Sequence, residues 1–241
     1  MVTELAETVR RDPGNAQAQL ALAGGYMRLF HFAQEDAVNR MPLSQIRDAA
    51  VAAEYSSAEE LEDWLARAVG KHCKYLKHSL RHAKKAVRLC PLQGQGYLYL
   101  GELSFLDPTR KTETWDFVEQ ALRVRPYDGT VLFHAGREAW LDGRIEEGLG
   151  FWRKSFAAGP IYQRQLIDWM AGRTIGAAID QEIAFVIEQF QPGLDILKYM
   201  QSRYQELAQP TQTQPLLAAI ASASQKQAQV EFDNGQREAA A

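Results

Sequence analysis

AKKAVRLCP (83–91) is a helix-forming segment that ends in proline, and the chain contains two further segments of the same design. They read VEQALRVRP (118–126) and WRKSFAAGP (152–160). The three prolines are 35 and 34 residues apart, and a small residue (Ala86, Ala121 or Ser155) stands five places before each. Proline ends a helix because its ring clashes with the preceding turn, and a small residue lets two helices approach closely. The pattern therefore predicts a repeating unit built from helices.

The segments that follow the first two prolines also match one another. GYLYLGELSFL (96–106) and TVLFHAGREAWLDGR (130–144) place Gly101 and Gly136 where we expect two helices to touch. Gly143 lies at the predicted turn between the two helices of its unit, where a left-handed backbone suits glycine. The repeat therefore extends beyond the proline-terminated helices to their partners.

The pattern resembles the tetratricopeptide repeat (TPR) family, in which a pair of antiparallel helices recurs with a proline after the second helix. The resemblance covers residues 1–32, with Pro13 as terminator, and residues 79–162. Tyr97 and Leu132 stand near the place of the family's first-helix tryptophan, so the repeats are divergent. The resemblance implies an all-α fold, a TPR-type α-solenoid of antiparallel helix pairs with a helical insertion in the first full repeat.

The period breaks after Phe32, and we interpret residues 33–70 as that insertion. It contains a short helix in 42–55, and Ser57 with Glu60 forms a capping box that predicts one long helix from there to Leu89.

Further amphipathic helices are expected after Pro160, so that 1–207 forms the solenoid and 208–215 a linker. Residues 216–241 are expected to hold a first helix, a turn at Gly235 and the start of a second helix. A repeat that stops there predicts a fragment of a longer protein.

The composition and charge of the chain exclude several classes of protein. Hydrophobic residues make up 46% and charged residues 24%, which is typical of a globular protein. The formal net charge of −3 argues against a general nucleic-acid binder. No apolar run reaches the roughly 20 residues of a membrane helix, and the N-terminus has no signal-peptide core. We expect a soluble chain whose partner is a protein or peptide, and no nucleic acid.

We find no motif for catalysis or for a cofactor. A nucleophile elbow and phosphate-binding glycine loops are absent from the sequence. His78 and His82 have the i, i+4 spacing of metal ligands, with Cys73 nearby, but no acidic residue occurs between Trp64 and Glu102. A helix this cationic opposes a divalent ion, so we predict no catalytic, metal or cofactor-binding residues.

The same helix carries a row of basic residues, which we call the basic stripe. Its members recur every three or four residues and are Lys71, Lys74, Lys77, Arg81, Lys84, Lys85 and Arg88. Leu76, Leu80, Ala83 and Val87 form the opposite, core-facing stripe. Two interpretations remain open: a solvated face of an amphipathic helix, or a docking face for an acidic protein, an anionic lipid surface or an anionic glycan.

TPR arrays bind ligands in a concave groove lined by first helices, and the repeat register assigns positions to that groove. They are Met27, Leu98, Glu102, Phe105, Phe133, Arg137 and Trp140. The clamp that holds chaperone tails needs Lys and Asn at such places, so that ligand is not expected. The apolar members suit an amphipathic segment or a neighbouring domain. The alternative is that the aromatic members are core residues.

Three stretches resemble a narrower group, the TPR region of bacterial O-antigen ligase-like membrane proteins. They are PLSQIRDAA (42–50), CPLQGQGYLYLGELSFLD (90–107) and RVRPYDGTVLFHAGREA (123–139). The resemblance covers about 1–205 and implies an extramembrane scaffold for assembly of envelope polysaccharide, with a membrane domain of the same protein as a possible partner. No ligase residue maps onto the chain. The alternative is an independent cytoplasmic TPR adaptor that binds a protein.

Overall fold

The fold is known from a computed structural model, which describes residues 2–35, 41–53, 55, 57–107, 113–171, 178–205, 207 and 210–239. Every regular element in these ranges is a helix, so the predicted all-helical class is confirmed. The chain divides into two compact units, Met1–Glu138 and Ala139–Ala241.

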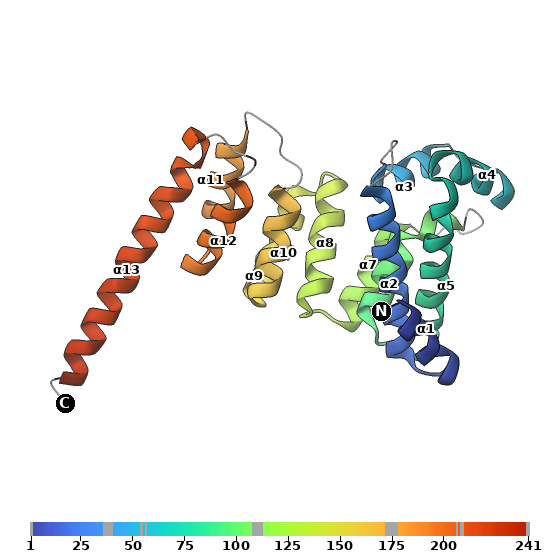
Figure 1. The fold of residues 1–241 in the computed structure, drawn as a ribbon, viewed down its shortest axis with the longest axis horizontal. Coiled ribbons are helices and arrows are strands. Elements are labelled where there is room, and N and C mark those ends of the chain that lie inside the picture. Colours follow the sequence, from blue (N-terminus) through green and yellow to red (C-terminus); the bar gives the residue numbers. More distant parts are fainter. Residues whose placement is uncertain are drawn as a thin grey trace. The chain divides into compact units, whose positions relative to one another are not determined.

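The helices follow one another as shown in Figure 1. Those that begin in the first unit are α1 (Val2–Arg11), α2 (Ala16–Glu35), α3 (Leu43–Ala52), α4 (Ala58–Ala68), η1 (Gly70–His72), α5 (Cys73–Leu89), α6 (Gly94–Glu102), η2 (Ser104–Leu106), α7 (Thr114–Val124) and α8 (Gly129–Leu141). The second unit adds α9 (Ile145–Ala157), α10 (Pro160–Ala171), α11 (Ile179–Phe190), α12 (Leu194–Tyr204), η3 (Pro210–Thr213) and α13 (Gln214–Ala239).

The helices of the first unit pack in pairs. The main pairs are α2 with α5 and α6 with α7, and α5 also packs on α6. α5 ends at Leu89 and α7 at Val124, each two residues before a repeating proline. Ala86 and Ala121 are fully buried where these helices meet their neighbours. The predicted role of the small residues as packing positions is therefore confirmed.

Gly101 sets the distance between α6 and α7. A Cβ atom added at Gly101 would lie 3.2 Å from the carbonyl oxygen of Thr114 and 3.3 Å from the Cβ of Phe117. Both contacts are tighter than ordinary van der Waals contact, so any side chain at this position would push the helices apart. Gly136 is buried as well, within α8.

The insertion takes part in the core of the first unit. Ile46 from α3 and Leu61 and Leu65 from α4 are buried in one cluster with Phe30 of α2 and Leu76 of α5. Burial of large aliphatic side chains such as these stabilises the fold by about 1.5–3 kcal/mol each. The segment 33–70 is thus held against α2 and α5 by apolar packing where the structure describes it.

The prediction of one long helix from Ser57 to Leu89 is wrong, because the helix is broken at Gly70. Gly70 has φ of +68°, which an α-helix does not accommodate, and a 3₁₀ turn separates α4 from α5. The predicted start is confirmed: the Oγ of Ser57 accepts a hydrogen bond from the backbone N–H of Glu60 at 3.2 Å.

In the second unit, α9 packs on α10 and α11, and α13 packs on α11 and α12. Its core contains a stack of indoles, with ring centroids 5.2 Å apart for Trp140 and Trp152 and 4.9 Å apart for Trp152 and Trp169. Trp152 is fully buried. Gly143, with φ of +77°, makes the predicted turn between α8 and α9.

The end of the chain differs from the prediction. α13 is a single helix of 26 residues that continues through Gly235, so the predicted turn there is wrong. An Asn-Gly dipeptide commonly marks a turn, but here the backbone stays helical. Helical structure also begins within the predicted linker 208–215, at Pro210.

Candidate functional site

Most of the predicted groove residues do not line a groove. Met27, Leu98, Phe105 and Phe133 are 4%, 3%, 7% and 4% exposed, so they belong to the core and offer almost nothing to a ligand. Their apolar side chains are buried because each helix turns this face toward its neighbours. Trp140 is half-buried in the second unit, where its ring packs on Trp152.

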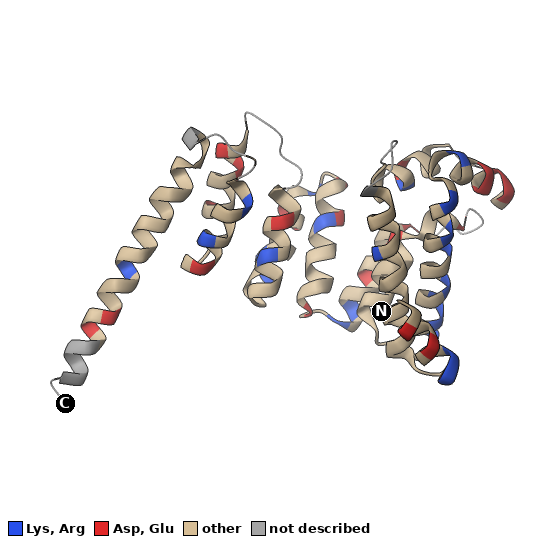
Figure 2. Cartoon of the chain, viewed as in Figure 1, with Lys and Arg blue, Asp and Glu red and all other residues tan. Residues whose placement is uncertain are grey.

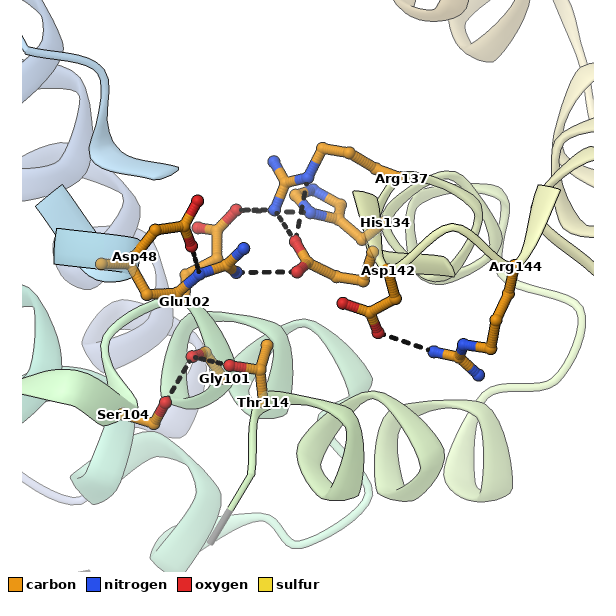
Figure 3. Close-up of polar contacts among 11 residues, drawn as sticks. Asp48, Gly101, Glu102, Ser104, Thr114, His134, Arg137, Asp142 and Arg144 are labelled. Carbon is orange, nitrogen blue, oxygen red and sulfur yellow. Dashed lines mark hydrogen bonds and ion pairs between the residues drawn. The ribbon is translucent and has the colours of Figure 1, made fainter. Parts of the chain in front are cut away.

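The two polar groove residues, Glu102 and Arg137, meet in a cluster that we call the charge network (Figure 3). It consists of Arg47, Glu102, His134, Arg137 and Glu138. Arg137 contacts Glu102 and also Glu138, the latter at 2.8 Å, and Nη1 of Arg47 contacts Oε2 of Glu138 at 2.7 Å. Nδ1 of His134 lies 3.6 Å from Oε1 of Glu102. All five residues belong to the first unit.

Three helices bring the network together. Glu102 is the last residue of α6, and His134, Arg137 and Glu138 lie within about one turn of each other on α8, so their side chains can reach the same region. Arg47 comes from α3 and is 91 residues away from Glu138 in sequence. The network therefore joins α3 to α8, and α8 to α6, by direct ion pairs.

The network is buried and electrically balanced. The side chains of Glu138, Glu102, Arg47 and Arg137 are 4%, 12%, 13% and 20% exposed. Burial favours a higher pKa for Glu102, but Arg137 and His134 outweigh it and hold that pKa well below its usual range. Burial likewise opposes the charge of Arg137, while Glu102 and Glu138 raise its pKa above its usual value.

Two carboxylates and two guanidiniums thus neutralise one another. A carboxyl group held ionised in this way is a poor proton donor at neutral pH. The arrangement is suited to hold helices together rather than to transfer protons.

The basic stripe lies on α5, with Lys71 just before it in η1 (Figure 2). Its six members on α5 fall on one face of the helix at 100° per residue, as predicted. Two of them have acidic partners: Lys77 pairs with Glu62 at 2.6 Å and Lys84 with Asp107 at 3.3 Å. Both partners lie outside the acid-free interval from Trp64 to Glu102, so the charge pattern of α5 itself does not indicate them.

Two histidines of α5 contact the ring of Tyr26, His78 in a tilted and His82 in a stacked arrangement. The ring of Tyr26 lies 5.0 Å from that of His78 and 5.7 Å from that of His82. Nδ1 of His82 donates to Oε1 of Gln19 at 2.7 Å, because the amide nitrogen of Gln19 itself donates to the carbonyl of Pro13.

The electrostatic environment keeps these histidines neutral. Burial, together with Arg81 and other neighbouring cations, lowers the pKa of His82 to about 4. Burial, Arg81 and Lys74 also lower the pKa of His78. In the described residues no three His, Cys, Asp or Glu side chains come close enough to hold a metal ion.

Among the described segments, no helix combines the length and the apolar character that crossing a bilayer requires. No protein-family model matches the sequence, and no curated protein matches it. The sequence reasoning named Glu102 and Arg137 as site residues, but it missed their partners Arg47, His134 and Glu138. Nothing in the local sequence around Arg47 indicates a partner on α8.

Proposed function

We propose that this chain is a non-catalytic TPR-type binding module, the extramembrane part of a protein that resembles the O-antigen ligase-like group and assists assembly of envelope polysaccharide. The observation that carries the proposal is the composition of the charge network. Its members come from the three stretches on which that resemblance rests. Arg47 lies in 42–50, Glu102 in 90–107, and the other three in 123–139.

The three stretches that carry the resemblance therefore also carry the residues of the charge network. The three stretches are separated in sequence, yet their charged residues neutralise one another in one buried cluster. A buried charge that loses its partner destabilises a protein strongly, so such residues can only be kept as a set. Any protein with the same five residues would need the same packing of these segments to neutralise them.

The repeat supports the TPR part of the proposal. Helices α5, α7 and α9 end at Leu89, Val124 and Ala157, close to the period of the prolines. The small residues at corresponding positions, Ala86, Ala121 and Ser155, are all buried. Stacked helix pairs form extended surfaces that serve binding.

The test is an in-frame deletion of the codons for residues 1–241 in the native gene, followed by gel analysis of the envelope polysaccharide. We expect loss or shortening of the attached polymer, with restoration when the intact gene is supplied. The control is that any remaining protein still accumulates in the membrane fraction. An unchanged polymer profile would contradict the proposal. If the polymer is unchanged and the native protein also fractionates with the cytosol, the chain is instead a cytoplasmic TPR adaptor that binds a protein.

A further inference from the structure

One face of α5 carries cations that the described part of the chain does not neutralise. We call them the free cation row: Lys71, Lys74, Arg81, Lys85 and Arg88. None has an acidic partner among the described residues, and all but the half-buried Lys85 are exposed. From Lys74 to Arg88 the row runs about 21 Å along the helix at 1.5 Å per residue.

The chain itself shows what kind of group this face binds. The two stripe members outside the free cation row are each held by a carboxylate, Lys77 by Glu62 of α4 and Lys84 by Asp107 after η2. Both carboxylates are side chains of neighbouring segments, and one belongs to a helix. Carboxylates on polypeptide are thus already accepted along one edge of the row, because Lys77 and Lys84 lie on the same edge of the stripe at 100° per residue.

The surroundings of the row limit the width of a partner. α4 presents four exposed acidic residues beside α5, and Figure 2 shows them as the red end of that helix. They are Glu59, Glu60, Glu62 and Asp63. A broad anionic surface such as a lipid bilayer would meet these acids together with the row, and like charges would repel it. A single narrow chain that follows α5 would avoid them.

The aromatic rings beside the row are already occupied. Tyr26 stacks on Tyr75 at 6.4 Å and makes a tilted contact with His78 at 5.0 Å, and His72 stacks on Tyr75 at 6.1 Å. The ammonium of Lys74 lies 5.3 Å from the ring of Tyr75. Binding of single-stranded nucleic acid relies on open ring faces for stacking. The row therefore suits recognition by charge and spacing.

We propose that the free cation row binds an acidic helical segment of a partner protein, with Asp or Glu repeated every three or four residues over about four turns. On one face of a helix such residues are about 5–6 Å apart, which matches the spacing from Arg81 through Lys85 to Arg88. Lys77, already paired with Glu62, occupies the turn between Lys74 and Arg81. The inference deepens the proposed binding function and rests on it, because it names the chemistry of the partner that the module holds.

The test uses a labelled alanine-rich helical peptide with glutamate on one face at every third or fourth position. Its anisotropy is measured with the purified chain at about 50 mM and about 500 mM NaCl, since screening shortens the range of exposed charges. Three variants are compared with the wild type. Lys74→Gln/Arg81→Gln/Arg88→Gln neutralises the row, and Lys74→Glu/Arg81→Glu/Arg88→Glu reverses it.

The third variant, Arg123→Glu/Lys198→Glu/Lys226→Glu, is the matched control. It changes the net charge as much as the reversal does, at exposed positions on α7, α12 and α13. Circular dichroism and thermal unfolding establish that every variant is folded.

We expect the wild type and the matched control to bind the peptide at low salt, with at least tenfold weaker affinity at high salt. We expect neutralisation to weaken binding at least tenfold and reversal to abolish it. A peptide with the same composition but glutamates spread around the helix is expected to bind at least threefold more weakly.

Equal binding by the reversed variant and the matched control, or no binding by the wild type, would overturn the proposal. Tighter binding of phosphatidylglycerol vesicles, polygalacturonate or oligothymidylate than of the peptide would also overturn it. None of these outcomes depends on the gene deletion, so failure here leaves the proposed envelope function standing.

Discussion

Arg47→Met removes one of the two guanidiniums that balance Glu102 and Glu138 in the charge network. Methionine retains most of the apolar stem of arginine, so the main loss is the ion pair at 2.7 Å. Removing one partner of a fully buried pair costs about 3–5 kcal/mol, because the other charge is left uncompensated. Glu138 is 4% exposed but keeps its contact with Arg137, so we expect about 2–3 kcal/mol.

The measurement is urea unfolding at neutral pH, followed by far-ultraviolet circular dichroism. The matched control is Arg67→Met, which removes an exposed cation from α4 and is expected to change stability by less than about 0.5 kcal/mol. The double variant Arg47→Met/Glu138→Gln also removes the excess negative charge that Arg47→Met leaves in the network. We expect it to cost at least about 1 kcal/mol less than the sum of the two single changes.

Additive single changes, or a cost for Arg47→Met no larger than that of the control, would refute the reasoning. In either case segment 33–70 would be held by its apolar packing against α2 and α5 alone, and the network would lose its role in joining the three stretches. The proposed function would then lose the observation that carries it.

Three further predictions concern the fold. Gly101→Leu is expected to lower the free energy of unfolding by about 1–3 kcal/mol, because it overpacks the α6–α7 contact. The control is Gly150→Leu, where an added Cβ meets nothing within 4 Å, and it is expected to be neutral or stabilising. Equal melting temperatures of the two variants would contradict the packing role of Gly101. The pKa of His82 is lowered to about 4 in the folded protein, so between about pH 6.5 and about pH 4 the unfolded chain binds more protons than the folded one. The free energy of unfolding therefore decreases as the pH falls through that window. We expect this loss to be about 2 kcal/mol after solvent screening and to be smaller in His82→Gln; parallel pH profiles of the two proteins would exclude His82 as the cause. Ser57→Ala is expected to cost about 0.5–2 kcal/mol in urea unfolding, because α4 loses its cap. Ser57→Thr keeps a capping oxygen and is expected to cost less. Equal losses in the two variants would show that the cap does not contribute to stability.

The helical fold could be predicted because its signals are local. Proline after α5 and α7, buried Ala86 and Ala121, and the left-handed turn at Gly143 follow from the backbone and steric properties of single residues. Gly70 shows the limit of such reasoning, because a glycine inside an amphipathic pattern can be helical or can end the helix. Gly70 has a positive φ and the helix ends there, which the hydrophobic periodicity of the sequence does not indicate.

The site was harder to predict than the fold because it depends on contacts across long sequence distances. The repeat register placed Glu102 and Arg137 near each other, but it assigned them to a groove instead of a buried ion pair. The partnership of Arg47 with Glu138 requires knowing how α3 docks, and residues between α2 and α3 interrupt the repeat. Met27 and Phe133 are buried, and for Phe133 this agrees with the alternative of a core residue, because an apolar side chain on a first helix fits a groove and a core equally well.

The indole stack of the second unit has an optical consequence. Chromophores whose centroids lie about 5 Å apart couple their electronic excitations, so Trp140, Trp152 and Trp169 are expected to give an exciton signal in circular dichroism. The remaining tryptophans, Trp64 and Trp115, lie in the first unit. The exciton signal therefore reports on side-chain packing in Ala139–Ala241. Loss of that packing can be followed separately from loss of helix in Met1–Glu138.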